Sequence, residues 1–146
     1  MTYAEWEKGV PYAISGDTLW NVEAYRLSLF AGDLAWDDVT KLMKDRRTQA
    51  LSDQLYRAIG SIGANIAEGY SRGTGRDRAR FYEYALGSAR EARDWYHKAR
   101  HVLGEVVTSH RIELITSIVR LLLKIIPNQR GEYIREDVEE YESALQ

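Results

Sequence analysis

Four arginines surround a glycine-rich stretch near the middle of the chain: Arg72, Arg76, Arg78 and Arg80. Gly73 and Gly75 can end one helix and turn the chain into the next. Guanidinium groups bind phosphate oxygens in pairs, and a helix N-terminus adds free N–H groups and a positive dipole end. The stretch lacks the Gly-Lys-Ser/Thr ending of a P-loop. It predicts a contact with nucleic-acid phosphates, although a plain solvated turn explains the same residues.

The charge along the chain favours the same region. The net charge is -5 over residues 1–40, +6 over 41–100, +2 over 101–130 and -5 over 131–146. A basic block of this kind is typical of a nucleic-acid-binding surface or of a solvated helical face. Arg46 and Arg47 belong to the block, and we expect them to form a second patch at the opposite end of the fold. RNA and DNA are equally compatible with these residues, and the acidic tail is a candidate competitor for them.

Other chemistry is poorly represented. His97, His101 and Glu105 lie four residues apart and could share one helix face, but no matching carboxylate set appears on another helix, so we predict no metal site. The chain has no cysteine and no nucleophile motif. The sequence therefore predicts a protein that is not an enzyme and needs no cofactor.

The N-terminus lacks the apolar segment of a secretory signal. The longest apolar stretch, 118–126, is too short to span a bilayer and contains two basic residues. We therefore expect a cytoplasmic protein without a membrane partner.

The arginine turn must be held by the helices on either side of it. Apolar residues recur at steps of three and four before and after the turn, which places them on one packing face of each helix. The first arm carries Leu51, Leu55, Ala58, Ile62 and Asn65, and the second carries Phe81, Ala85, Ser88, Ala92, Trp95, Ala99 and Val102. Thr74 is a plausible cap for the second helix, three residues before Asp77. We interpret Asn65 as a polar group that fixes the packing register, and we expect an Arg57–Glu91 pair.

Two further helices complete the prediction of an antiparallel up-down-up-down four-helix bundle over residues 18–127. It is preceded by an irregular arm, 1–17, and followed by an acidic tail, 128–146. The first long helix is expected to bury Val22, Tyr25, Leu29, Gly32, Trp36, Val39 and Met43. Gly32 indicates either a close crossing or an interruption. Breaks are expected near 45–50, 70–75 and 104–108, and Tyr3, Trp6 and Tyr12 of the arm are candidates to dock on the bundle or on a partner.

The last long helix, expected over 108–126 and ended by Pro127, carries two apolar stripes. One stripe is enough to cover a core inside a monomeric bundle. The second stripe therefore predicts a homo-oligomer whose interface includes Ile118, Leu121 and Ile125.

The hairpin also carries a motif. Its residues are Gln54, Arg57, Ala58, Ser61, Ile62, Asn65-Ile66-Ala67-Glu68-Gly69, Arg72, Phe81, Ala85-Leu86-Gly87-Ser88 and Glu91. This pattern resembles a bacterial family called four-helix bundle proteins or 23S ribosomal RNA intervening-sequence proteins. The similarity extends over about residues 20–127. The chain departs from the family at Gly63, where proline is usual, and at Tyr56, where arginine is usual.

The resemblance implies a ring-shaped homopentamer, with nucleic-acid binding as one expected role. The alternative role is a protein-interaction scaffold. The family is related to accessory proteins of diversity-generating retroelements, which bind a reverse transcriptase and its RNA, so a reverse transcriptase is a possible partner.

Overall fold

All of the regular secondary structure in the computed structural model is helical over the residues that it describes, 1–131. The body consists of the long helices α3 (Glu23–Leu42), α4 (Gln49–Tyr70), α5 (Gly75–Lys98) and α7 (Glu105–Arg130). The shorter segments are α1 (Tyr3–Glu7), α2 (Tyr12–Ser15), η1 (Thr18–Asn21), η2 (Arg46–Thr48) and α6 (Arg100–Leu103). The predicted all-α fold is confirmed.

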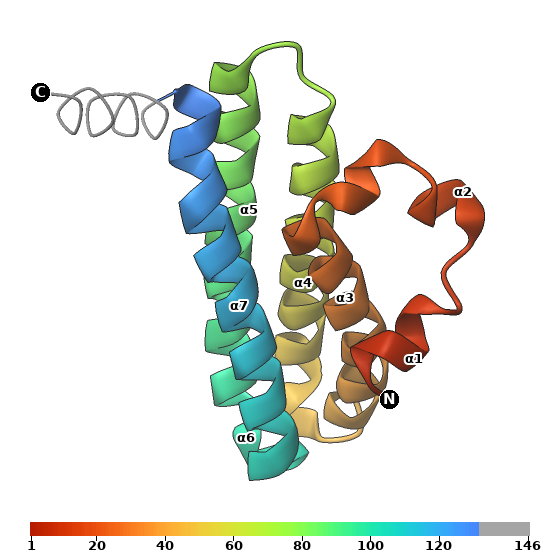
Figure 1. Ribbon diagram of the computed structural model, residues 1–146. Coiled ribbons are helices and arrows are strands. Elements are labelled where there is room, and N and C mark those ends of the chain that lie inside the picture. The colour runs from red at the N-terminus through yellow and green to blue at the C-terminus, as the bar shows by residue number, and fades with distance from the viewer. Residues whose placement is uncertain (132–146) are drawn as a thin grey trace, which may run out of the picture.

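The long helices run antiparallel in up-down-up-down order, because short connections join them (Figure 1). α4 packs between α3 and α5, and α5 packs between α4 and α7. The contact that closes the bundle between α7 and α3 is less extensive than these three. The breaks fall at 43–48, at 71–74 and around Gly104, close to the predicted positions.

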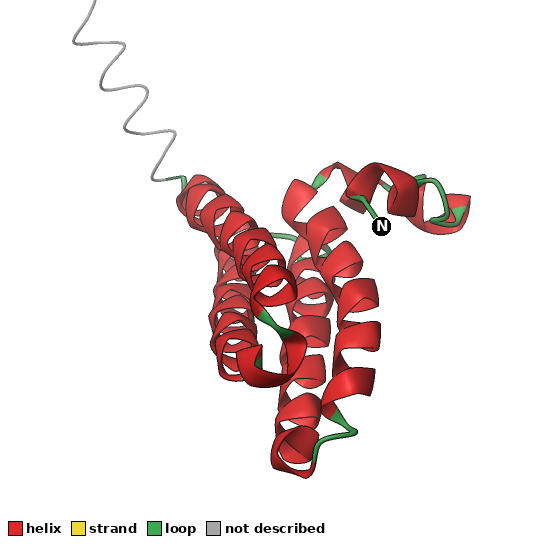
Figure 2. Ribbon diagram, turned by 90° about the horizontal axis from the view of Figure 1, so that it is seen from below, coloured by secondary structure: helices red, strands yellow, loops and turns green. Residues whose placement is uncertain are grey.

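The N-terminal arm is more regular than predicted and lies beside α3, outside the four long helices (Figure 2). Thr2 and Glu5 form a capping box that starts α1. Trp6 is buried against Phe30 in a second, aromatic cluster, and its Nε1 donates to Asp33 Oδ2 at 2.6 Å. Tyr12, in contrast, is 85% exposed. The arm therefore docks on the bundle through Trp6, and Tyr3 packs against the same aromatic cluster.

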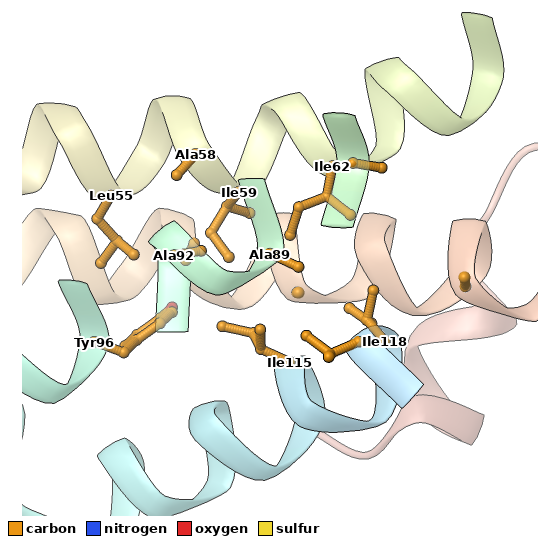
Figure 3. Packing of buried hydrophobic residues seen from close by; sticks show 14 of the residues in the cluster. Leu55, Ala58, Ile59, Ile62, Ala89, Ala92, Tyr96, Ile115 and Ile118 are labelled. Atoms are coloured by element: carbon orange, nitrogen blue, oxygen red, sulfur yellow. The ribbon is translucent and has the colours of Figure 1, made fainter. Parts of the chain in front are cut away.

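The main core combines isoleucines of α4 with small residues of α5 (Figure 3). Ile59, Ile62 and Ile66 are at most 1% exposed. The α5 face opposite them is lined by fully buried alanines, Ala85, Ala89 and Ala92. Small side chains let the neighbouring helix approach closely, so α4 and α5 pack tightly against each other.

Helix α3 buries a different face from the one predicted. Most of the residues that it buries in the main bundle lie one position before the predicted set: Ala24, Ser28, Ala31, Ala35, Asp38 and Leu42. Val39 of the predicted set is also buried, and Phe30 and Leu34 are buried in the aromatic cluster of the arm. Trp36 and Met43, which were expected inside, are 63% and 56% exposed. Small residues face inward because the isoleucines of α4 already fill the space. Gly32 does not interrupt the helix, and the close crossing is instead at Gly63, where a Cβ would lie 2.8 Å from Ser28 Oγ.

Helix α7 corrects the predicted oligomer interface. Ile118 is fully buried within the chain, and Leu121 and Ile125 are half-buried. α7 packs against both α5 and α3, and Leu114 also touches the aromatic cluster of the arm. A helix with two neighbours in its own chain needs a wide apolar face, so the second stripe alone does not require another subunit.

The predicted end of α7 at Pro127 is also wrong. The helix continues to Arg130 and ends at Gly131, whose φ of +79° is left-handed. Pro127 removes only the hydrogen bond to the carbonyl of Leu123, a residue that is 47% exposed and close to water. Residues 128–130 therefore belong to the bundle, and the rest of the predicted acidic tail lies outside the described residues.

A buried polar cluster that the sequence did not indicate joins three of the long helices. Asp38 of α3 is 1% exposed and accepts hydrogen bonds from Arg111 of α7, from Nε at 2.7 Å and from Nη2 at 3.2 Å. The hydroxyl of Tyr96 on α5 donates to the same carboxylate at 2.7 Å. Burial and the neighbouring Asp38 raise the pKa of Tyr96, so the phenol stays neutral and donates.

Candidate nucleic-acid interface

The turn between α4 and α5 is built by helix caps and by one close contact. The Thr74 hydroxyl accepts from the backbone N–H of Asp77 at 3.2 Å, which confirms the predicted cap. A Cβ on Gly75 would overlap the backbone carbonyl of Gln129. Glycine at this position therefore allows the start of α5 to lie against the end of α7.

The predicted arginines occupy different environments. Arg72 pairs with Glu68 at 2.6 Å and lies over the Phe81 ring, 4.6 Å from its centroid. Arg80 also lies over Phe81, at 5.3 Å, and is 3.9 Å from the carboxylate of Asp77. Both arginines are exposed, so these ion pairs are weak and compete with water and phosphate.

Arg78 has a structural role that the sequence did not indicate. It is half-buried, its Nε donates to the carbonyl of Arg72 at 3.1 Å, and its Nη1 donates to Gln129 Oε1 at 3.0 Å. It therefore ties the turn to α7. Arg76 is exposed and makes no ion pair within residues 1–131, which leaves its guanidinium available to a ligand.

Two residues near the turn were not predicted. Arg130 at the end of α7 pairs with Glu83 and brings a further cation to this end of the bundle. Tyr84 is 52% exposed and packs edge-to-face on Phe81, with ring centroids 5.6 Å apart. An exposed aromatic ring beside arginines can stack on a nucleobase while the arginines contact phosphates. The signal for Tyr84 was its position four residues after Arg80, on the same side of the helix.

Arg46 and Arg47 lie at the opposite end of the bundle from the turn (Figure 1). Arg47 pairs with Asp45 at 2.7 Å, and the hydrogen bonds from Arg47 lower the pKa of Asp45 to about 2. Arg46 is exposed. The structure therefore does not bring these two arginines together with those of the turn.

The motif residues mostly hold the hairpin together. Asn65 Nδ2 donates to the carbonyl and the hydroxyl of Ser61, at 2.9 and 3.0 Å, and Ser61 Oγ lies 2.9 Å from Ser88 Oγ across the pair. Ser88 thus faces Ser61, one turn further along α4 than Arg57. The predicted Arg57–Glu91 pair is wrong, because no ion pair joins these two residues and Glu91 instead accepts from Trp95 Nε1. Gln54 is exposed, and Gly69 lies where a Cβ would come within 2.8 Å of Phe81.

Neither a metal site nor a membrane-spanning helix is found among residues 1–131. No group of three or more His, Cys, Asp or Glu residues in 1–131 is arranged to hold a metal ion. None of the helices in that range is both long and apolar enough to cross a membrane.

Comparison with known proteins identifies the family. The family model described as 23S rRNA-intervening sequence protein matches residues 21–128. A solved structure from Bacteroides thetaiotaomicron, described as a protein of unknown function from the S23 ribosomal protein family, has the same fold with a TM-score of 0.66 and 24% identity. The similarity covers 70% of this chain and 97% of that one. A comparison with curated proteins finds no match. The chain therefore belongs to the 23S rRNA-intervening sequence protein family.

Proposed function

We propose that the protein binds RNA without catalysing a reaction, through the surface around the α4–α5 turn. The strongest support is that Arg76 and Arg80 are exposed at the start of α5, beside the exposed ring of Tyr84. Arg72 belongs to the same surface, and Arg78 holds it in place. The family description refers to a 23S rRNA intervening sequence, which favours RNA over DNA.

The surface suits binding with little sequence preference. Exposed guanidinium groups contact phosphates, which carry no sequence information, and an aromatic ring stacks on any base. No cofactor is needed for such binding. A single patch with few cations binds weakly, so several copies in one assembly would increase the avidity.

Changing both Arg76 and Arg80 to Ala should weaken binding to a mixed-sequence single-stranded RNA roughly tenfold at about 50 mM salt. Each phosphate contact contributes a slope of about 0.7 in log affinity against log salt, so the slope should fall by about 1.4. Fluorescence anisotropy across a salt titration measures both. The matched control replaces Arg90 and Lys98, which are exposed further along α5, and removes the same charge.

The result that would overturn this proposal is a wild-type protein that does not bind at about 50 mM salt. Equal weakening by the control pair would instead show that only the net charge matters and not the turn.

We further propose that the protein assembles into a homopentamer, and that the contact is made by the outer face of α3 and α4. The exposed Trp36 packs edge-to-face on Tyr56, with ring centroids 5.9 Å apart. Beside them lies a groove of about 350 Å³ whose lining includes Gly60 and Ala64, where backbone can approach closely. Apolar exposure of this kind marks a protein contact. The pentamer itself is what the family resemblance implies.

Replacing Trp36 with Glu should convert the assembly into monomers, because a charge would replace the largest apolar group on this face. Light scattering coupled to size exclusion at micromolar concentration measures the mass. The control is Leu123→Glu, at a position on α7 that is 47% exposed. A wild-type monomer would contradict the assembly. We would then expect the same face to bind a different protein. The preferred hypothesis would be the scaffold role, with a reverse transcriptase as one possible partner.

A further inference from the structure

A groove of about 560 Å³ lies between the starts of α3 and α5 and the ends of α4 and α7. Its apolar lining comes from Val22, Ala24, Leu121 and Ile125, and the ring of Tyr82 is nearby. Leu121 and Ile125 are two residues of the predicted oligomer interface, and the chain leaves both half-buried. The groove follows α7 from Leu121 to Gln129, which is about 12 Å of helix.

The groove has a basic end. Arg78 lines it, is half-buried, and has no carboxylate partner within residues 1–131. Its two hydrogen bonds go to a carbonyl and to an amide oxygen, which leave its charge unneutralised. A partly buried guanidinium gains most from an acidic partner. The groove therefore fits a segment that is apolar on one face and acidic elsewhere.

The segment that follows α7 in the sequence has this chemistry. Residues 132–146 carry six acidic groups and one basic group. Ile134, Val138, Tyr141 and Leu145 recur at steps of four and three, the spacing of one helical face. As a helix, 134–145 would be about 16 Å long, enough to follow the groove. α7 ends at Gly131, two residues after Gln129 of the groove lining, and the positive φ of Gly131 turns the chain out of the helix.

We propose that residues 132–146 dock in this groove of their own chain and place their carboxylates beside Arg78 and the turn arginines. Docking covers Leu121 and Ile125 without a second subunit. It also makes the tail a competitor of RNA, and this consequence rests on the proposed function. Release of the tail would then be required before the turn surface is fully open.

The absence of cysteine allows docking to be tested in the 146-residue chain without RNA. Asn21 is an exposed residue of η1 on the groove rim, and Thr40 is exposed near the far end of α3, the helix that follows η1. One variant carries Asn21→Cys with Ser143→Cys, and its control carries Thr40→Cys with Ser143→Cys. A short bis-maleimide should link the first pair within one chain at least about tenfold faster than the control pair, because docking raises the effective concentration of the two thiols.

Three results of this crosslinking decide the docking. Equal rates for the two pairs would overturn it. Links formed only between chains would also overturn it and would assign the groove to the tail of a second copy. Adding Ile134→Ser and Val138→Ser to the first pair should reduce its rate to that of the control, whereas Ala144→Ser should not.

The same tail variants test the competition, because Ser substitutions leave all six acidic groups in place. If the docked tail leaves roughly a tenth of the molecules open, its release raises the apparent RNA affinity about tenfold. If the RNA affinity is unchanged while crosslinking remains selective, the tail docks in the groove but does not compete with RNA. Lack of RNA binding by every variant would count against the proposed function. The crosslinking result alone would then decide whether the tail docks in the groove.

Discussion

Replacing Asp38 with Ala should lower the free energy of unfolding by about 3–5 kcal/mol, because it leaves a buried cation without its partner. The Asp38 carboxylate holds the Arg111 guanidinium through two hydrogen bonds, at 2.7 and 3.2 Å, and accepts a third from Tyr96. The Arg111 side chain is only 15% exposed, so water can replace few of the hydrogen bonds that Asp38 provides. A small domain is stable by about 5–15 kcal/mol in total, so the expected loss is a large part of it.

The charge state of the Asp38–Arg111–Tyr96 cluster supports a loss of stability of this magnitude. Burial opposes the charge of Arg111, but the hydrogen bonds and the charge of Asp38 outweigh burial and raise the pKa of that guanidinium. Removal of the carboxylate therefore takes away the group that makes a buried charge tolerable. Tyr96 also loses the acceptor of its hydroxyl group, at a further cost of about 1–3 kcal/mol if water does not replace it.

Urea denaturation followed by circular dichroism measures the loss. Asp37→Ala is the matched control, since Asp37 precedes Asp38 and is exposed, and its substitution should change the stability by less than about 0.5 kcal/mol. A triple variant with Asp38→Leu, Arg111→Met and Tyr96→Phe should recover most of the stability, because replacing a whole buried ionic cluster with apolar groups is often neutral. Equal effects of Asp37→Ala and Asp38→Ala would show that the cluster does not stabilise the fold.

The four long helices and their order could be predicted because apolar spacing and glycine breaks are local signals. The face that each helix buries was less predictable. In α3, two faces one residue apart both have regular spacing, and the sequence favoured the one with Trp36 and Met43. The structure buries the face with alanines and Asp38, because the partner helix supplies the large side chains. Size and hydrophobicity alone do not reveal this choice.

The candidate site shows the same limit. The arginines of the turn could be found from their type and their position beside glycines. Their individual roles depended on residues distant in the sequence: Gln129 reaches Arg78 from the end of α7, and Arg130 pairs with Glu83. The Asp38–Arg111 pair was missed for the same reason, since its members lie 73 residues apart in the sequence. Long-range pairing of single polar residues has no periodic signal.

The corrected position of Ile118 leads to a second large effect. Ile118→Glu should destabilise the chain itself by roughly 5 kcal/mol or more at pH 7, and not merely dissociate an oligomer. Loss of the buried isoleucine costs about 1.5–3 kcal/mol. A carboxyl group buried in an apolar core can have a pKa near 8–9, so forcing it into the fold adds several kcal/mol at pH 7. Ile118 is fully buried in the main core, on a helix that packs against both α5 and α3.

Thermal unfolding of Ile118→Glu beside Leu123→Glu measures this effect, because both changes add one carboxylate to α7. Leu123 is 47% exposed, so its variant should melt within a few degrees of the wild type, whereas the Ile118 variant should be largely unfolded at 37 °C. The sign of the pH dependence is a further check. Since the folded-state pKa of the new carboxyl is raised, its penalty should shrink as the pH falls towards about 4, where the group is protonated in both states. A folded, smaller species for Ile118→Glu would contradict the buried position and restore this residue to an intersubunit surface.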